Sequence, residues 1–150
     1  MRIIAACLLA AMLAACSADH DAAIPGNAQD DQPFAGIGED EVIRLTGTEP
    51  FWGGEISGGL FTYTTPENIE GQRLPVTRFA GRGGLSFSAE ADGVAVDMAI
   101  TPAACSDGMS DRTYPFTVTL QWGEDQRIGC GWSDVHPFSG GAEQELEAAE

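Results

Sequence analysis

Residues 94–101 read Val-Ala-Val-Asp-Met-Ala-Ile-Thr, an alternation of larger apolar side chains with small or polar ones. Because successive side chains of a strand point to opposite faces, this pattern predicts a strand with one buried face. The same period recurs at residues 115–122, Pro-Phe-Thr-Val-Thr-Leu-Gln-Trp. The alternation favours an all-β domain whose interior is filled by large inward side chains, among them Phe87, Met98, Phe116, Leu120 and Trp122.

Turns rich in Gly, Asp and Asn separate these segments at the short intervals typical of hairpins. We expect about eight strands, near residues 41–47, 50–57, 60–65, 73–80, 84–90, 93–101, 114–122 and 126–132. The long connection is expected at residues 102–112. Parallel pairing needs crossovers of about a dozen residues or more, so the strands should be antiparallel. The predicted fold is a small antiparallel β-barrel or sandwich, with no confident helix in this region.

The charge of the chain excludes one class of function. It has 7 basic residues, all of them Arg, against 23 acidic residues, and its net charge is −16. Cationic side chains supply most of the non-specific affinity for nucleic acid, so such an acidic surface predicts no nucleic-acid partner. The longest apolar run, residues 3–16, is also shorter than the roughly 20 residues that a membrane-spanning helix requires.

The N-terminus has the three parts of an export signal, with Arg2, an apolar core and small residues before Cys16. The sequence Leu-Ala-Ala-Cys at residues 13–16 resembles the bacterial lipobox. That resemblance implies cleavage before Cys16 and lipidation of its sulfur and amine, which would anchor the protein on a bilayer. An ordinary secretory signal with a chance thiol at Cys16 is the alternative. By the same resemblance, Ser17 favours the outer membrane, with the protein facing the periplasm.

Composition divides the chain into four parts. Residues 1–15 are the expected lipoprotein signal peptide, and residues 16–40 are too polar to bury themselves and predict a flexible tether. The β-domain is expected at residues 41–138. Residues 139–150 end in an acidic Ala/Glu run, which predicts a disordered tail.

Four cysteines are present, and the lipobox resemblance implies that Cys7 leaves with the signal and that Cys16 takes the lipid. Cys105 and Cys130 remain as an even pair, and outside the cytoplasm such a pair usually forms a disulfide. Two free thiols are the alternative. A metal site is not expected, because neither cysteine has a second Cys or a His at ligand spacing.

The familiar catalytic arrangements are missing from the sequence. Its two histidines are His20 in the tether and His136, which is followed by Pro137 and predicts a turn after the last strand. Neither histidine sits beside a plausible nucleophile in the sequence. We therefore predict a non-catalytic protein without a cofactor. An enzyme ranks third, after the binding module and the ligand carrier described below.

Two segments carry unusual groupings of residues. Residues 47–52 read Gly-Thr-Glu-Pro-Phe-Trp, which predicts either a turn that feeds an aromatic side chain into the barrel end or a recognition surface. Residues 105–116 read Cys-Ser-Asp-Gly-Met-Ser-Asp-Arg-Thr-Tyr-Pro-Phe, and Asp-Gly favours a tight turn there. A calcium site on Asp107, Ser110 and Asp111 is the less favoured alternative, because the EF-hand spacing is absent and the ion needs about six to eight oxygens. We expect both segments to form one surface, with binding residues Glu49, Phe51, Trp52, Asp107, Met109, Ser110, Asp111, Arg112 and Tyr114.

Together with Gly-Cys at residues 129–130, these two segments resemble the pattern of a widespread family of uncharacterised bacterial envelope lipoproteins. The resemblance covers about residues 41–132 and implies a small β-barrel-like domain with the two motif cysteines bridged, and it carries no activity. The plan of lipid anchor, eight strands and one disulfide is also similar to that of the membrane-bound inhibitors of c-type lysozyme. From these features we predict a binding or inhibitory module for a basic envelope protein, steered by the negative charge. The alternative is a barrel that carries a small apolar ligand or lipid.

Overall fold

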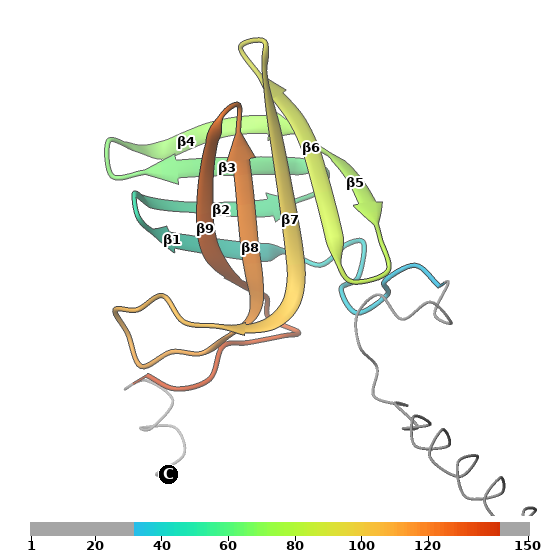
Figure 1. Cartoon of the computed structure of the whole chain (residues 1–150), viewed down its shortest axis with the longest axis vertical. Coiled ribbons are helices and arrows are strands. Elements are labelled where there is room, and N and C mark those ends of the chain that lie inside the picture. The colour runs from blue at the N-terminus through green and yellow to red at the C-terminus, as the bar shows by residue number, and fades with distance from the viewer. Residues whose placement is uncertain (1–31, 142–150) are drawn as a thin grey trace, which may run out of the picture.

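The computed structural model describes residues 32–141, and this part of the chain is an antiparallel β-sheet with no helix, as predicted (Figure 1). The predicted signal peptide, the lipidation site Cys16 and the acidic run at residues 142–150 lie outside the described residues. The strands are β1 (Ile43–Thr48), β2 (Phe51–Ser57), β3 (Leu60–Thr65), β4 (Asn68–Pro75), β5 (Thr77–Ala80), β6 (Leu85–Ala91), β7 (Val94–Cys105), β8 (Tyr114–Trp122) and β9 (Asp125–Trp132).

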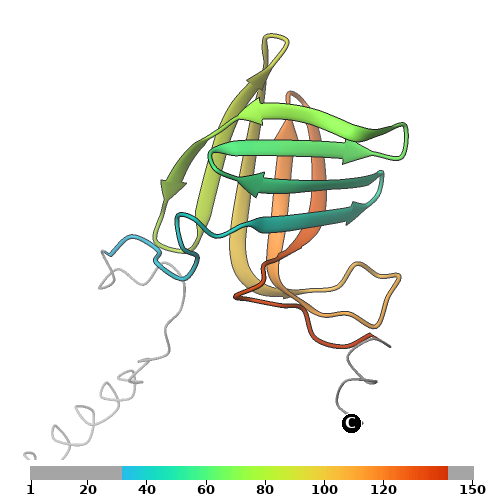
Figure 2. The same ribbon diagram turned by 180° about the vertical axis from the view of Figure 1, so that it is seen from behind.

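The strands follow one another in space in the order β4-β3-β2-β1-β9-β8-β7-β6-β5, and every neighbouring pair is antiparallel. The first strand of the sheet order, β4, is joined to the last, β5, through the single residue Val76. The sheet therefore curls into a nearly closed barrel, in which β1 to β4 cross β7 to β9 at a steep angle (Figures 1 and 2).

Two strand boundaries differ from those expected. The segment expected as one strand at residues 73–80 is divided between β4, which begins at Asn68 and pairs with β3, and β5, which pairs with β6. The connection expected to begin at Pro102 begins later, because β7 continues to Cys105 after an irregularity in its pairing with β8. Both differences depend on which strand lies alongside, which local alternation does not encode.

The barrel interior is filled with apolar side chains. Four of the five large residues expected to point inward are buried, and Trp122 packs against them half-buried. The inward face of the wall formed by β1, β2 and β9 carries glycines, and a Cβ at Gly47, Gly54 or Gly129 would collide with an aromatic side chain. These positions are glycine because aromatic rings lie directly against the backbone there. The interior of the barrel is therefore packed rather than hollow.

The packed region extends beyond the expected residues 41–138 at both ends. The side chain of Ile37 is only 1% exposed and belongs to the core, and Phe34 packs against that core. At the other end, Ser139 pairs with Thr113 through two backbone hydrogen bonds of 2.8 and 2.9 Å. Single apolar residues in polar surroundings show no period, so the sequence did not reveal these contacts. Within residues 32–141 there is no helix with the length and hydropathy needed to cross a membrane.

Candidate functional site

The predicted disulfide between Cys105 and Cys130 is present, with 5.6 Å between the two Cα atoms. It joins β7 to β9, which are separated in the sheet by β8. The end of β7, where Cys105 still pairs with Tyr114 of β8, is therefore bonded to a strand that is not its neighbour. The connection that follows, residues 106–113, extends on the same side of the barrel as the β1–β2 turn (Figure 1). We call residues 106–113 the motif loop.

The motif loop is organised around the carboxylate of Asp107. Its Oδ1 accepts hydrogen bonds from the backbone N–H groups of Met109 (3.0 Å) and Ser110 (2.8 Å). Its Oδ2 accepts hydrogen bonds from the hydroxyls of Ser110 (2.8 Å) and Tyr114 (3.2 Å). The backbone donors of Met109 and Ser110 contribute most to lowering the pKa of Asp107 to about 2. Asp107 is therefore ionised at every physiological pH, and its charge holds the loop in shape.

The segment after β9 braces the motif loop from outside. The guanidinium carbon of Arg112 lies 4.4 Å from the ring centroid of Phe138, a cation–π geometry. The Phe138 ring also contacts the rings of Tyr114 and Trp132, with centroids 5.6 and 6.0 Å apart. Together with the Thr113–Ser139 pairing, these contacts fix the C-terminal end of the loop, and the disulfide at Cys105 fixes its N-terminal end.

At the β1–β2 turn, the two aromatic residues of Glu-Pro-Phe-Trp point in opposite directions, as strand alternation requires. Trp52 is 4% exposed and stacks on Tyr63 inside the barrel, with its indole against Gly47 and Gly129. Phe51 is 54% exposed on the outer face. Of the two expectations for this segment, the core role therefore applies to Trp52, and Phe51 is available for recognition.

Three connected hollows surround the β1–β2 turn on the outer face. The first, which we call the disulfide groove, has a volume of about 280 Å³ and lies between Glu49 and the motif loop, over Ile128 and the disulfide. The second, the Phe51 groove, has a volume of about 410 Å³ and is bordered by Phe51 and Ile69. The third hollow, of about 500 Å³, lies between Glu49 and Glu67. Shared lining residues connect all three into one depression.

This depression combines negative charge with exposed apolar surface. The charged residues that line it are Glu49, Glu67 and Asp107, and all three are acidic. Phe51, Ile69 and Ile128 are among the exposed large hydrophobic residues of the described chain. An acidic and apolar hollow suits a ligand that is basic and partly apolar.

The structure brings together only part of the predicted binding set. Glu49, Phe51 and Asp107 line the depression, and Trp52 contributes to the Phe51 groove although it is nearly buried. Tyr114 is buried beneath the motif loop and acts through its hydrogen bond to Asp107. The remaining predicted residues lie on the loop but line none of these three hollows: Met109, Ser110, Asp111 and Arg112. Sequence reasoning missed Ile69 and Ile128, which carry no local signal other than apolar side chains on outward strand positions.

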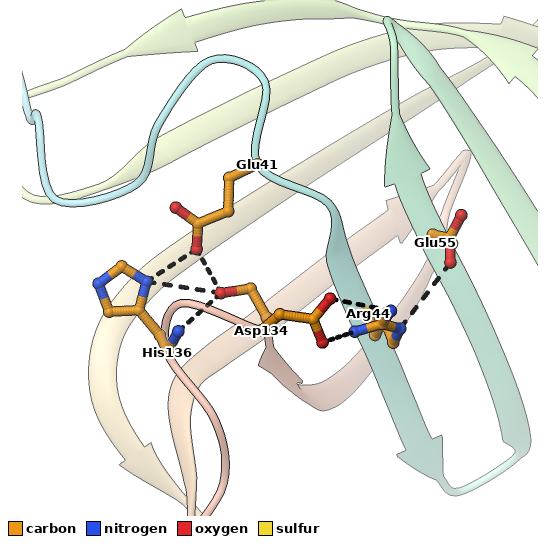
Figure 3. A network of polar contacts seen from close by, with 6 residues as sticks. Glu41, Arg44, Glu55, Asp134 and His136 are labelled. Atoms are coloured by element: carbon orange, nitrogen blue, oxygen red, sulfur yellow. Dashed lines mark hydrogen bonds and ion pairs between the residues drawn. The ribbon is translucent and has the colours of Figure 1, made fainter.

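A second polar cluster joins the segment just before β1 to the segment just after β9 (Figure 3). The carboxylate of Glu41, whose side chain is 7% exposed, contacts Nδ1 of His136 at 2.7 Å and accepts a hydrogen bond from the Ser133 hydroxyl. Burial alone would raise the pKa of Glu41, but the hydrogen bonds from Ser133, His136 and the Gly38 N–H outweigh it and lower the pKa. The expectation that His136 has no nucleophile nearby is wrong, because Ser133 is also buried beside it.

This cluster does not have the order of a catalytic triad. In a triad the imidazole lies between the hydroxyl and the carboxylate, with one ring nitrogen toward each. Here the Ser133 hydroxyl donates directly to Glu41, and Nδ1 of His136 faces that same carboxylate. Beside it, Arg44 donates to Asp134 at 2.7 Å and lies 4.0 Å from Glu55 (Figure 3). The network therefore ties the segments flanking β1 and β9 together.

No group of three or more metal-ligating His, Cys, Asp or Glu side chains occurs within residues 32–141. The calcium alternative placed the ion on Asp107, Ser110 and Asp111. Both carboxylate oxygens of Asp107 instead accept hydrogen bonds from N–H and O–H groups. In the loop, this carboxylate therefore serves as an acceptor for the chain's own donors.

Replacing Asp107 by Asn tests this role of the charge. Its folded-state pKa of about 2 lies below the ordinary value, so its stabilisation is present above about pH 4 and is lost as the pH falls toward 2. We expect Asp107→Asn to lower the free energy of unfolding by about 1 to 2 kcal/mol at pH 7. Urea titrations at pH 7 and at pH 2 should show this difference shrinking at the lower pH. Asp111→Asn, an exposed change on the same loop, should cost less than about 0.5 kcal/mol, and an equal loss in both variants would contradict the assignment.

Comparison with known protein families, with curated proteins and with solved structures finds no match to this chain.

Proposed function

We propose that this protein is a non-catalytic binding module of the cell envelope that docks a basic protein in the depression around the β1–β2 turn. The N-terminal sequence supports a lipid-anchored protein at the periplasmic face of the outer membrane. The partner is then another envelope protein, and a basic, lysozyme-like enzyme is a candidate through the similarity of plan to lysozyme inhibitors.

The observation that carries the proposal is the composition of the depression. Its charged lining residues are all acidic, and they surround the exposed side chains of Phe51, Ile69 and Ile128. Charged residues of one sign beside apolar side chains give both steering and contact area to an oppositely charged partner. The net charge of −16 supports the same choice, since it attracts basic proteins over longer range.

The rigidity of the surface also supports binding. The disulfide, the Asp107 hydrogen bonds and the contacts of Phe138 hold the motif loop in one shape. A surface that is already ordered loses less conformational entropy when a partner docks. The filled interior of the barrel favours this outer surface over the alternative of a ligand carrier.

Photo-crosslinking tests the proposal. A photoreactive phenylalanine analogue placed at Phe51 should give a discrete adduct in cells that make the protein, identified by mass spectrometry as a basic protein. The matched control is Phe79 on β5, which is 66% exposed but does not line the depression. Glu49→Arg should reduce the adduct at position 51 at least tenfold by reversing the local charge, whereas Glu90→Arg on β6 should leave it unchanged. Equal adducts at positions 51 and 79, or an acidic protein captured at position 51, would contradict it.

A further inference from the structure

Resting on the proposed function, we propose that the disulfide groove receives one arginine side chain of the partner, with Glu49 as its counter-ion. The apolar part of the same partner segment then lies over the adjoining Phe51 groove.

The disulfide groove has the shape and polarity of a socket for one polar side chain. Its volume of about 280 Å³ is bounded on one side by Glu49 of the β1–β2 turn and on the other by Ser106 and Asp107 of the motif loop. Gln126 and Ile128 of β9 contribute further lining. The walls come from segments far apart in sequence. The disulfide in the lining ties the motif loop to β9, and β9 pairs with β1, which leads into the turn that carries Glu49.

The two carboxylates at the groove have different roles. Asp107 uses both oxygens to accept hydrogen bonds from its own loop, so it contributes negative charge but has its acceptors occupied. The exposed side chain of Glu49, in contrast, makes no hydrogen bond or ion pair with any residue in the range 32–141. Glu49 is therefore the carboxylate with both oxygens available to an incoming cation, and Asp107 strengthens the field that attracts it.

The chemistry of the groove favours a guanidinium over an ammonium group. A guanidinium is planar and donates two parallel hydrogen bonds to one carboxylate. Its flat face is weakly hydrated and can lie on the apolar lining that Ile128 and the disulfide provide. The amide oxygen of Gln126 and the hydroxyl of Ser106 can accept its remaining N–H groups. An ammonium group is compact and strongly hydrated, and would use only part of this surface.

The continuity between grooves adds a sequence requirement for the partner. Thr46 and Gly47 line both the disulfide groove and the Phe51 groove, so the two hollows are adjacent. A segment whose arginine enters the first hollow places a nearby apolar side chain over Phe51 and Ile69. The inferred ligand is therefore an extended segment with an apolar residue close to an arginine.

Peptide titrations of the whole ¹⁵N-labelled chain test this inference. The probes are three blocked peptides, acetyl-Leu-Gly-X-Gly-amide, in which X is arginine, lysine or citrulline, the neutral isostere of arginine. We expect the arginine peptide to shift the backbone resonances of Ser106, Gln126 and Ile128, and to bind about tenfold more tightly than the citrulline peptide. The lysine peptide should bind with intermediate affinity.

Variants of the protein separate the socket from general charge attraction. Glu49→Gln should remove the tenfold preference for arginine over citrulline, because the counter-ion is lost while the shape of the groove remains. The control Glu90→Gln removes the same charge on β6 and should keep the preference. Shifts elsewhere on the protein, no binding of any peptide, or equal effects of the two variants would overturn the inference.

Failure of the arginine socket and failure of the proposed docking surface give different results. If crosslinks form at Phe51 to a basic protein while Glu49→Gln leaves the peptide preference intact, the arginine socket is wrong and the docking surface stands. If no crosslink forms at Phe51, the docking surface itself is wrong.

Discussion

Replacement of both Cys105 and Cys130 by serine is expected to lower the free energy of unfolding by about 3 kcal/mol. The bond closes a loop across a sequence separation of 25 residues. In the chain-entropy model, its removal raises the conformational entropy of the unfolded chain and so favours unfolding by about this free energy. The loss should appear in urea unfolding followed by tryptophan fluorescence, with a steeper dependence of the unfolding free energy on urea concentration, because the unfolded chain without the crosslink is less compact. Because the bond also holds the motif loop over β9, the crosslink at Phe51 should weaken in the same variant.

Reduction provides the control for this prediction. Treating the unaltered protein with a reductant should produce the same loss of stability as the double replacement. The double variant should in turn be insensitive to reductant. A loss below about 1 kcal/mol, with the amide resonances of residues 106–113 unchanged, would show that the loop keeps its place without the bond.

Gly129→Ala is expected to lower the free energy of unfolding by about 3 kcal/mol, at the upper end of overpacking effects. A methyl group on Gly129 would come within 2.7 Å of Cζ2 of Trp52 and closer still to the backbone carbonyl oxygen of Thr46. The carbonyl cannot move without disturbing the β1–β9 pairing, in which Thr46 lies opposite Cys130. Thermal and urea unfolding measure the loss directly.

A second glycine serves as the matched control. A methyl group on Gly81 would meet its nearest atoms at 3.6 and 3.7 Å, which is ordinary contact. Gly81→Ala should therefore change the stability by less than about 0.5 kcal/mol. Adding Trp52→Phe to Gly129→Ala should recover part of the loss, because the smaller ring removes one of the two collisions. Equal effects of the two glycine replacements would contradict this account of the barrel wall.

Much of the fold could be predicted from the sequence, because the period-two pattern is strong in β7 and β8. The alternation correctly predicted which face of each strand is buried, including the side chains of Met98 and Leu120. The division at Val76 could not be predicted, because the apolar pattern continues through it while the neighbouring strand changes from β3 to β6. Strand exchange of this kind is set by closure of the barrel and not by local preference.

The candidate site was predictable only in part. The cysteine pair and the two unusual segments could be found from residue types alone. Which aromatic residue points inward could not, because it depends on register: Trp52 lies opposite Gly47 and occupies the space that the glycine leaves. The meeting of Glu41 with His136 spans 95 residues, and no short-range pattern carries that information.

The pairing of β1 with β9 has a consequence for how the chain must acquire its structure. In chain order β1 is the first strand, but its second partner, β9, is the last. Ile43 and Leu45 thus belong to an edge that stays open until the last strand of the domain is available to pair. Contacts of such large sequence separation, 92 residues between Glu41 and Ser133 for example, are typical of slow-folding topologies. The hairpins can form early, whereas the cooperative gain in stability must await the final strand.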